Sequence, residues 1–397
     1  MNRQNTPTVA VENRHFLDDT RPFGILIIAS SCMSYVPGGN IGTLIFGVYL
    51  ALFICFSLVK GKIQITDGRS VIIVLFIIWS SLSFFTLSSN GYGFDEWSRG
   101  IVPFLFFALY LFIGKLSVES RRVLAKYLFY ACVIWAIRIV GEAMILASQG
   151  SDVLTVRLTY RVTDAVLPYP FIAITYLLFC GTDLKPIIRW ALIFMFTYLL
   201  FWIGYRAGIV LATIPIMVFI LDNFARKNVW PVGLLVVLLI ALYSSGIFSS
   251  FGLLERFSGL GAETDGSKVA EWRYAIDHFL SSPLFGMGIG WQVPGDIAYI
   301  GVDTTGIIIP DRVGYVHSAF AYIAMNLGIV GLVIYYSIVR PTMIWPSDDA
   351  LKKFSSISLL VLLLFCLTQA SFRTIQTIIM VIALVKINTF KRSPVFY

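Results

Sequence analysis

The chain has 397 residues, of which 58% are hydrophobic and 13% are charged, whereas roughly 25% of the residues in an ordinary soluble domain are charged. The mean hydropathy is +0.82, and apolar stretches close to 20 residues long recur along the chain, as in proteins that cross a membrane several times. This composition excludes a soluble enzyme and the collagen-like, disordered and disulfide-scaffold classes. The five cysteines all lie inside or at the end of apolar stretches, so we expect neither a disulfide framework nor a cysteine metal cluster.

Taken in chain order, residues 1–21 are polar and hold no apolar core followed by a cleavage site, so they are predicted to be a cytosolic tail. Twelve apolar stretches follow, and each is predicted to be a membrane helix. The stretches are 22–36, 41–59, 70–88, 100–117, 124–147, 166–181, 187–204, 207–221, 231–248, 314–339, 354–371 and 374–389. Residues 22–248 thus carry the first nine helices and 314–389 the last three, before a second cytosolic tail at 390–397.

Two details of the apolar stretches suggest local structure. The turn Pro37-Gly38-Gly39-Asn40 separates the first two short stretches, which are therefore predicted to form a helical hairpin. Arg138 and Glu142 lie one helical turn apart within the fifth stretch. We expect them to form an internal ion pair that lowers the cost of burying both charges.

Residues 249–313 form one large segment between the ninth and tenth stretches, and a segment of this length is expected to contain structure of its own. Ser267 is predicted to cap an amphipathic helix on the outer membrane face, which ends before Ser281-Ser282-Pro283. Its apolar positions are Val269, Trp272, Ile276 and Phe279. The sequence Phe285-Gly286-Met287-Gly288-Ile289-Gly290 follows no strand, so we interpret it as a close-packed turn and not as a nucleotide loop.

The distribution of Lys and Arg between the stretches sets the orientation. With the N-terminus in the cytosol, 20 of the 30 basic residues lie in inner segments. The net charge of +8 is then mostly a topology signal, and nucleic-acid binding is not implied. Apart from Arg138 within a helix, the basic residues on the outer side are nearly all arginine: Arg99, Arg157, Arg161, Arg206, Arg256, Lys268, Arg273, Arg312 and Arg373.

The excess of arginine on the outer side is a functional clue. A guanidinium group binds phosphate oxygens through two parallel hydrogen bonds, so this surface suits a phosphorylated, anionic ligand. Pairing of the same arginines with nearby carboxylates at the lipid interface is the alternative explanation.

Three segments carry a family resemblance. Tyr205-Arg206-Ala207-Gly208 begins the eighth stretch, and Glu271-Trp272-Arg273 lies in the expected loop helix. His317-Ser318 opens the tenth stretch, and nine residues separate it from Gly328-Ile329-Val330-Gly331. With twelve membrane helices and one large outer loop, the chain resembles the superfamily of O-antigen ligases and O-antigen polymerases. The likeness covers the whole topology and is densest over about 200–335.

The resemblance implies an all-α polytopic protein of the bacterial inner membrane, with both termini in the cytoplasm and the active site facing the periplasm. It further implies an inverting, metal-independent transferase without a cofactor, whose donor is a glycan on undecaprenyl diphosphate. His317 would be the catalytic base. Arg206 and Arg273, helped by Arg157 or Arg161, would bind the diphosphate and supply the charge that other transferases take from a metal ion.

The acceptor divides the superfamily, since ligases transfer the glycan to lipid A-core and polymerases transfer it to another lipid-linked repeat. We prefer a ligase, because polymerases often have a second sizeable outer loop and the corresponding loop here, 148–165, is short. A polytopic transporter or flippase is the alternative of another class, since twelve helices alone allow it. No matching pair of interrupted helices is visible in the two halves of the sequence.

Overall fold

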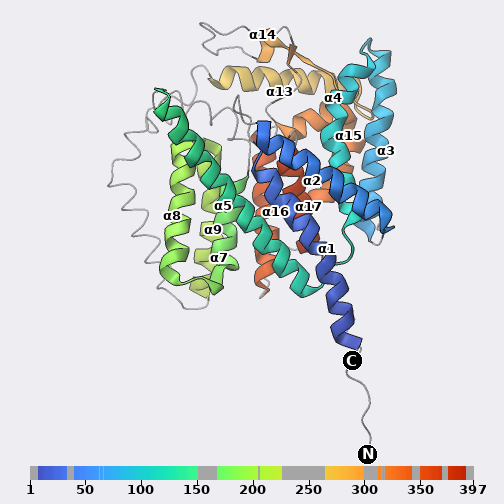
Figure 1. Ribbon diagram of the computed structural model, residues 1–397. Coiled ribbons are helices and arrows are strands. Elements are labelled where there is room, and N and C mark those ends of the chain that lie inside the picture. The colour runs from blue at the N-terminus through green and yellow to red at the C-terminus, as the bar shows by residue number, and fades with distance from the viewer. Residues whose placement is uncertain are drawn as a thin grey trace, which may run out of the picture.

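The computed structural model is a bundle of long helices with a smaller set of elements across one end (Figure 1). It describes part of the chain, and every structural statement below refers to that part. The described residues are 8–33, 40–61, 63–65, 67–150, 168–203, 206–225, 264–298, 312–313, 316, 318–341, 349–368 and 374–389.

The first half of the chain supplies five α-helices and a 3-10 helix. They are α1 (Thr8–Ser31), α2 (Asn40–Val59), α3 (Gly68–Ser89), α4 (Phe94–Leu105), η1 (Phe106–Phe112) and α5 (Val118–Ser148). Helix α1 begins at Thr8, inside the stretch predicted to be a tail. Helices α1 and α2 pack together as the predicted hairpin requires, and the rings of Phe23 and Phe53 lie 6.0 Å apart.

The middle of the chain supplies α7 (Tyr169–Phe179), η2 (Gly181–Asp183), α8 (Pro186–Ile203) and α9 (Arg206–Ala225). The elements at one end of the bundle are α13 (Thr264–Ser281), α14 (Gly295–Ala298) and a two-residue antiparallel pair of strands, β1 (Val293–Pro294) and β2 (Arg312–Val313). The chain closes with α15 (Ala319–Val339), α16 (Ala350–Thr368) and α17 (Ile375–Asn388).

Most predicted apolar stretches within the described residues overlap one α-helix, while the ninth, 231–248, lies outside them. The fourth, 100–117, is not one helix as predicted, because α4 ends at Leu105 and the 3-10 helix η1 continues to Phe112. Six of these helices are long and apolar enough to cross a membrane: α2, α3, α5, α8, α15 and α16. Helices α7, α9 and α17 have shorter apolar cores. The structure therefore supports a helical membrane protein, and the count of twelve crossings stays a prediction.

The core of the bundle is organised around α17. Its residues from Gln376 to Asn388 are all buried, and it packs against α16, η1 and α5. Helix α2 is the opposite case, because apolar side chains such as Ile41, Leu44 and Leu52 are more than half exposed. An apolar helix with exposed apolar side chains is suited to contact with lipid.

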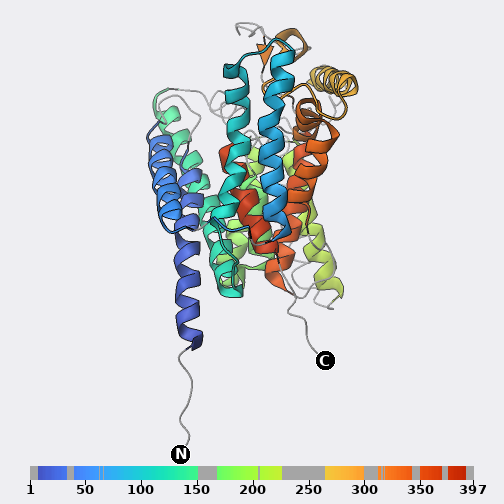
Figure 2. The same ribbon diagram turned by 90° about the vertical axis from the view of Figure 1, so that its right-hand side faces the viewer.

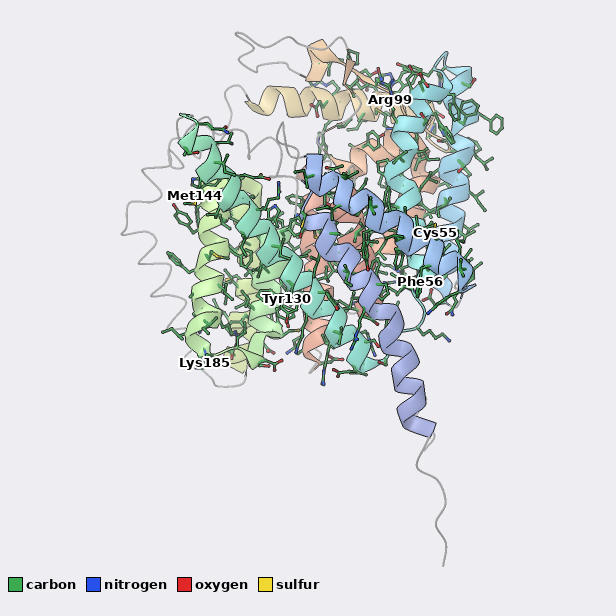
Figure 3. The ribbon with its side chains drawn as sticks, in the orientation of Figure 1. Cys55, Phe56, Arg99, Tyr130, Met144 and Lys185 are labelled. Carbon is green, nitrogen blue, oxygen red and sulfur yellow. The ribbon has the colours of Figure 1, made fainter. Side chains whose placement is uncertain are left out.

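The two ends of the bundle differ in their charged residues. Arg99 lies at the end that carries α13 and α14, called the α13 end below, whereas Lys185 lies at the opposite end (Figure 3). At the opposite end, Arg69 of α3 donates to the carbonyl of Arg340 at 2.8 Å, and Lys386 of α17 donates to the carbonyl of Ile113. Of these five basic residues, all except Arg99 belong to the set predicted to face the cytosol.

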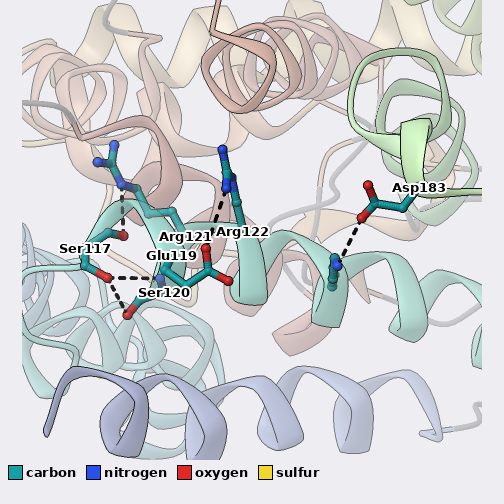
Figure 4. Close-up of polar contacts among 7 residues, drawn as sticks. Ser117, Glu119, Ser120, Arg121, Arg122 and Asp183 are labelled. Atoms are coloured by element: carbon teal, nitrogen blue, oxygen red, sulfur yellow. Dashed lines mark hydrogen bonds and ion pairs between the residues drawn. The ribbon is translucent and has the colours of Figure 1, made fainter. Parts of the chain in front are cut away.

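Local capping explains where two helices begin at the opposite end. Ser117 caps α5 by accepting a hydrogen bond from Ser120 N, and Lys126 of α5 pairs with Asp183 of η2 at 3.2 Å (Figure 4). Asp67 caps α3 in the same way and accepts a further bond from Tyr110. Partial burial raises the pKa of Asp67, but the hydrogen bonds from Ser70 and Tyr110 outweigh it, so that the pKa lies below its ordinary value.

Candidate functional site

The start of α15 is held against the end of α16. Ser318 caps α15 by accepting a hydrogen bond from Ala321 N at 3.2 Å, and its hydroxyl donates to the carbonyl of Cys366 at 3.3 Å. Ser318 and Val316 are both completely buried. His317, the predicted base, lies outside the described residues, between these two buried neighbours.

The start of α9 lies at the same level of the bundle as the start of α15. Asp222 of α9 pairs with Lys353 of α16 at 2.8 Å. From that pair, α9 rises about 24 Å back to Arg206, and α16 rises about 20 Å to Cys366. Because α9 packs along α16, the first residue of α9 and the start of α15 both lie near the end of α16. The side chain of Arg206 is outside the described part of the structure.

Helix α7 begins at this place too. The rings of Phe171, near the start of α7, and Phe365, near the end of α16, have centroids 5.1 Å apart. Three helices, α7, α9 and α15, therefore begin around the last turn of α16. Helix N-termini carry partial positive charge and free N–H groups, so this part of the bundle favours a negatively charged group.

Helix α15 is bent sharply within the segment predicted as one continuous helix over 314–339, and that prediction is wrong at Gly328. This residue has φ 66° and ψ −169°, which is not helical. The rings of Phe320 and Tyr335 lie 6.2 Å apart, although a straight helix would rise about 22 Å between these positions. Neither part of α15 is long enough to cross a bilayer alone.

The backbone groups released by the bend are bonded by the segment that follows α13. The carbonyl of Met325 accepts from Met287 N at 2.8 Å, and that of Asn326 accepts from Gly288 N at 2.9 Å. Beyond the bend, Ile329 N donates to the carbonyl of Pro283 at 2.8 Å. These bonds explain why a bent helix is stable in an apolar bundle, where an unbonded backbone group is costly.

The glycine-rich sequence 285–290 is a close-packed turn, as predicted. Gly286, Gly288 and Gly290 all have positive φ. A Cβ added to Gly288 would lie 2.5 Å from Leu87 N, and one added to Gly290 would lie 2.5 Å from the carbonyl oxygen of Glu96. The glycines therefore allow backbone to meet backbone between this turn and α3 and α4.

The predicted loop helix is present as α13, although its start differs from the prediction. The helix begins at Thr264, so Ser267 lies inside it and is not its cap. The Glu271-Trp272-Arg273 motif divides between two sides of α13: Glu271 is completely buried, whereas Arg273 is exposed. Among the described residues, no hydrogen bond or ion pair joins Arg273 to α9 or to the start of α15.

Of the remaining arginines predicted to bind the diphosphate or to form an ion pair, only Arg138 lies in the described part of the structure. Arg157 and Arg161 lie outside the described residues. Arg138 pairs with Glu142 at 3.3 Å within α5, and both side chains are largely buried. The predicted internal ion pair is therefore confirmed.

The chain was compared with models of known protein families. Residues 190–336 match the family model described as O-antigen ligase. The resemblance to the O-antigen ligase and polymerase superfamily is confirmed. The O-antigen ligase segment runs from α8 to the second part of α15, and it includes Arg206, Arg273, His317, Gly328 and Gly331. No curated protein matches the chain.

The family indicates a membrane enzyme that transfers glycans, and the structure adds residues that sequence reasoning missed. Trp79 of α3 donates from its indole N–H to the carbonyl of Leu327 at 3.0 Å, at the bend of the O-antigen ligase segment. Asn326, beside the bend, is completely buried. Trp79 lies far from the bend in the sequence, so no local pattern could indicate its role.

Proposed function

We propose that this protein is a metal-independent, inverting glycan transferase that moves a polysaccharide from undecaprenyl diphosphate to an acceptor sugar at the periplasmic face. We further propose that it is an O-antigen ligase, with lipid A-core of lipopolysaccharide as the acceptor. The observation that carries the proposal is the family match over 190–336, which contains the predicted base and both principal arginines.

The proposed reaction requires two kinds of residue. His317 takes the proton from the acceptor hydroxyl as its oxygen attacks the anomeric carbon of the donor sugar. The bond from that carbon to the diphosphate oxygen breaks, and undecaprenyl diphosphate leaves with the electron pair. Arg206 and Arg273 stabilise the negative charge that develops on the leaving diphosphate, with Arg157 or Arg161 as further candidates. Attack opposite the leaving group inverts the anomeric configuration.

The arrangement of helix ends supports this chemistry. Arg206 is the first residue of α9, and His317 precedes the first residue of α15. Both helices begin near the last turn of α16, where α7 also directs its N-terminal end. An anionic diphosphate at this position would be favoured by the helix ends as well as by the arginines.

The proposed orientation places both termini in the cytoplasm and the α13 end in the periplasm of a cell with an inner membrane. It rests on the 20 basic residues in inner segments, and α1 begins at the end of the bundle opposite α13 (Figure 1). Fusions to a reporter active only in the periplasm test this orientation. A reporter should be active near residue 260 and inactive near 120 and 350, and activity at 350 would overturn the orientation and the site with it.

Glycan analysis of a deletion strain tests the function. Loss of glycan from lipid A-core, with complete chains still present on the lipid carrier, would support a ligase. Single repeats still attached to lipid A-core, without longer chains, would show a polymerase instead. Accumulation of lipid-linked glycan on the cytosolic leaflet alone would show a flippase and overturn the transferase proposal.

A further inference from the structure

The outward side of α13 is apolar. Val269, Trp272, Ile276 and Leu280 recur at helical spacing, and their exposed fractions are 60%, 39%, 49% and 65%. Glu271 and Ala275 are buried and face the bundle instead, where α13 packs on α15. The predicted amphipathic helix thus buries a polar residue against the protein and turns its apolar side chains away from it.

The exposed apolar surface continues past the end of α13. Leu284 and Phe285 are 56% and 55% exposed. We define the apolar ridge as Val269, Trp272, Ile276, Leu280, Leu284 and Phe285. A contiguous apolar surface of this kind on a folded protein marks a site of contact with a partner or a membrane.

The depth of Phe285 identifies what the apolar ridge contacts. The ring of Phe285 stacks on that of Trp79, with centroids 5.3 Å apart and an interplanar angle of 17°. Trp79 is about 15 Å from the end of α3 at Ser89. Between these two levels α3 exposes Leu82 and Phe85, as expected of a lipid-facing helix. Phe285 therefore lies at the level of the lipid-facing part of α3 and not above the membrane.

The direction of α13 also supports contact with the membrane. The helix lies across the long helices in Figure 1, and Figure 2 shows it end-on at the margin of the bundle. A helix in this position is parallel to the membrane plane when the bundle crosses the bilayer. Arg273 is exposed, one turn from both Val269 and Ile276, at the border of the apolar ridge. A cation at the border of an apolar helix face complements the phosphate layer of a bilayer.

We propose that the apolar ridge inserts into the phospholipid leaflet at the α13 end of the bundle and holds Arg273 at the level of the lipid phosphates. This contact concerns the bilayer and is independent of the proposed function. If the proposed function also holds, the same contact positions Arg273 where the diphosphate of a lipid-linked donor must lie.

Site-specific photocrosslinking in the full-length protein tests the proposal. A photoreactive phenylalanine analogue replaces Ile276 on the ridge or, as the matched control, the exposed neighbour Asp277, which points about 100° further around the helix. The protein is reconstituted in nanodiscs of phosphatidylethanolamine and phosphatidylglycerol, without donor or acceptor, and irradiated. Intact-protein mass spectrometry then measures the phospholipid adducts.

We expect at least tenfold more phospholipid adduct at position 276 than at 277, with Leu280 as a second ridge position if the first variant is not recovered. Equal adducts at 276 and 277, no lipid adduct at the ridge positions, or crosslinks to a second copy of the chain would each overturn the proposal. The readout is a lipid adduct and not turnover, so a failure of the proposed glycan transfer would leave this result unchanged.

Discussion

Gly328→Ala tests whether the bend in α15 is needed to hold the segment that follows α13, residues 283–288, in place. A Cβ at this position would lie 2.3 Å from the carbonyl oxygen of Leu284 and 2.7 Å from Phe285 N. Both neighbours are backbone atoms in a segment that hydrogen bonds hold at Ser282, Pro283 and Met287, so they cannot move aside as a flexible side chain would. The φ of 66° with ψ of −169° also belongs to a region that is essentially restricted to glycine.

The expected loss of stability follows from these two effects. Backbone strain of this kind costs about 1–3 kcal/mol, and overpacking adds about 1–3 kcal/mol, so we expect a loss of roughly 2–6 kcal/mol. If the segment 283–288 instead moves away, the variant loses the bonds from Met287 N, Gly288 N and Ile329 N. Turnover should fall in either case, because the first part of α15 leads directly from His317.

Thermal unfolding of the purified protein in detergent measures the effect, with Gly141→Ala as the matched control. Gly141 lies in α5, and a Cβ there would meet nothing within 4 Å. Alanine is favoured over glycine in a helix by about 1 kcal/mol, so the control should unfold at the same or a higher temperature. Equal unfolding temperatures for Gly328→Ala and the wild type would refute the account of the bend.

Four further substitutions test the roles of the arginines, of His317 and of Asp67. Arg206→Lys and Arg273→Lys keep the charge but remove the paired hydrogen bonds, so the transfer rate should fall sharply while insertion is normal; full activity of both variants in purified protein would count against diphosphate binding. His317→Gln cannot take a proton at neutral pH, so it should lose about 10²–10⁴-fold in turnover with little change in donor binding, and near-normal turnover would make His317 structural. Folding lowers the pKa of Asp67 below its ordinary value of 3.8. The ionised Asp67 therefore stabilises the folded protein at pH values above 3.8, and this stabilisation is lost as the pH falls through the lowered pKa. Asp67→Asn should therefore weaken the acid dependence of the unfolding temperature, and an unchanged dependence would contradict this assignment.

The extent of the helices could be predicted where hydrophobicity alone decides it. Helix α2 begins and ends within one residue of the predicted 41–59. Helix α5 begins six residues before the predicted stretch, because the capping hydroxyl of Ser117 starts a polar first turn that hydropathy does not detect. The start of α13 was misplaced for a related reason, since Thr264, Asp265 and Ser267 are all chemically able to cap a helix.

The site could be predicted only where it depends on local spacing. The i, i+4 spacing of Arg138 and Glu142 was sufficient to predict their ion pair. The bend at Gly328 was not predictable, because glycine is common in membrane helices and the bend depends on Pro283, Met287 and Gly288, some forty residues earlier. The meeting of α7, α9 and α15 at the end of α16 is likewise a tertiary arrangement that no single segment encodes.

The bend in α15 has a consequence for how the protein is assembled in the cell. During synthesis, the 21 residues of α15 can enter the bilayer only as a straight helix, because the carbonyls at Met325 and Asn326 need partners within the helix until other partners arrive. In the proposed orientation, the final shape can form only after 283–288 has crossed the membrane and has docked beside α3. Membrane insertion and maturation of this segment would then be separate steps, and a translocation defect upstream would leave a fully inserted but unbent α15.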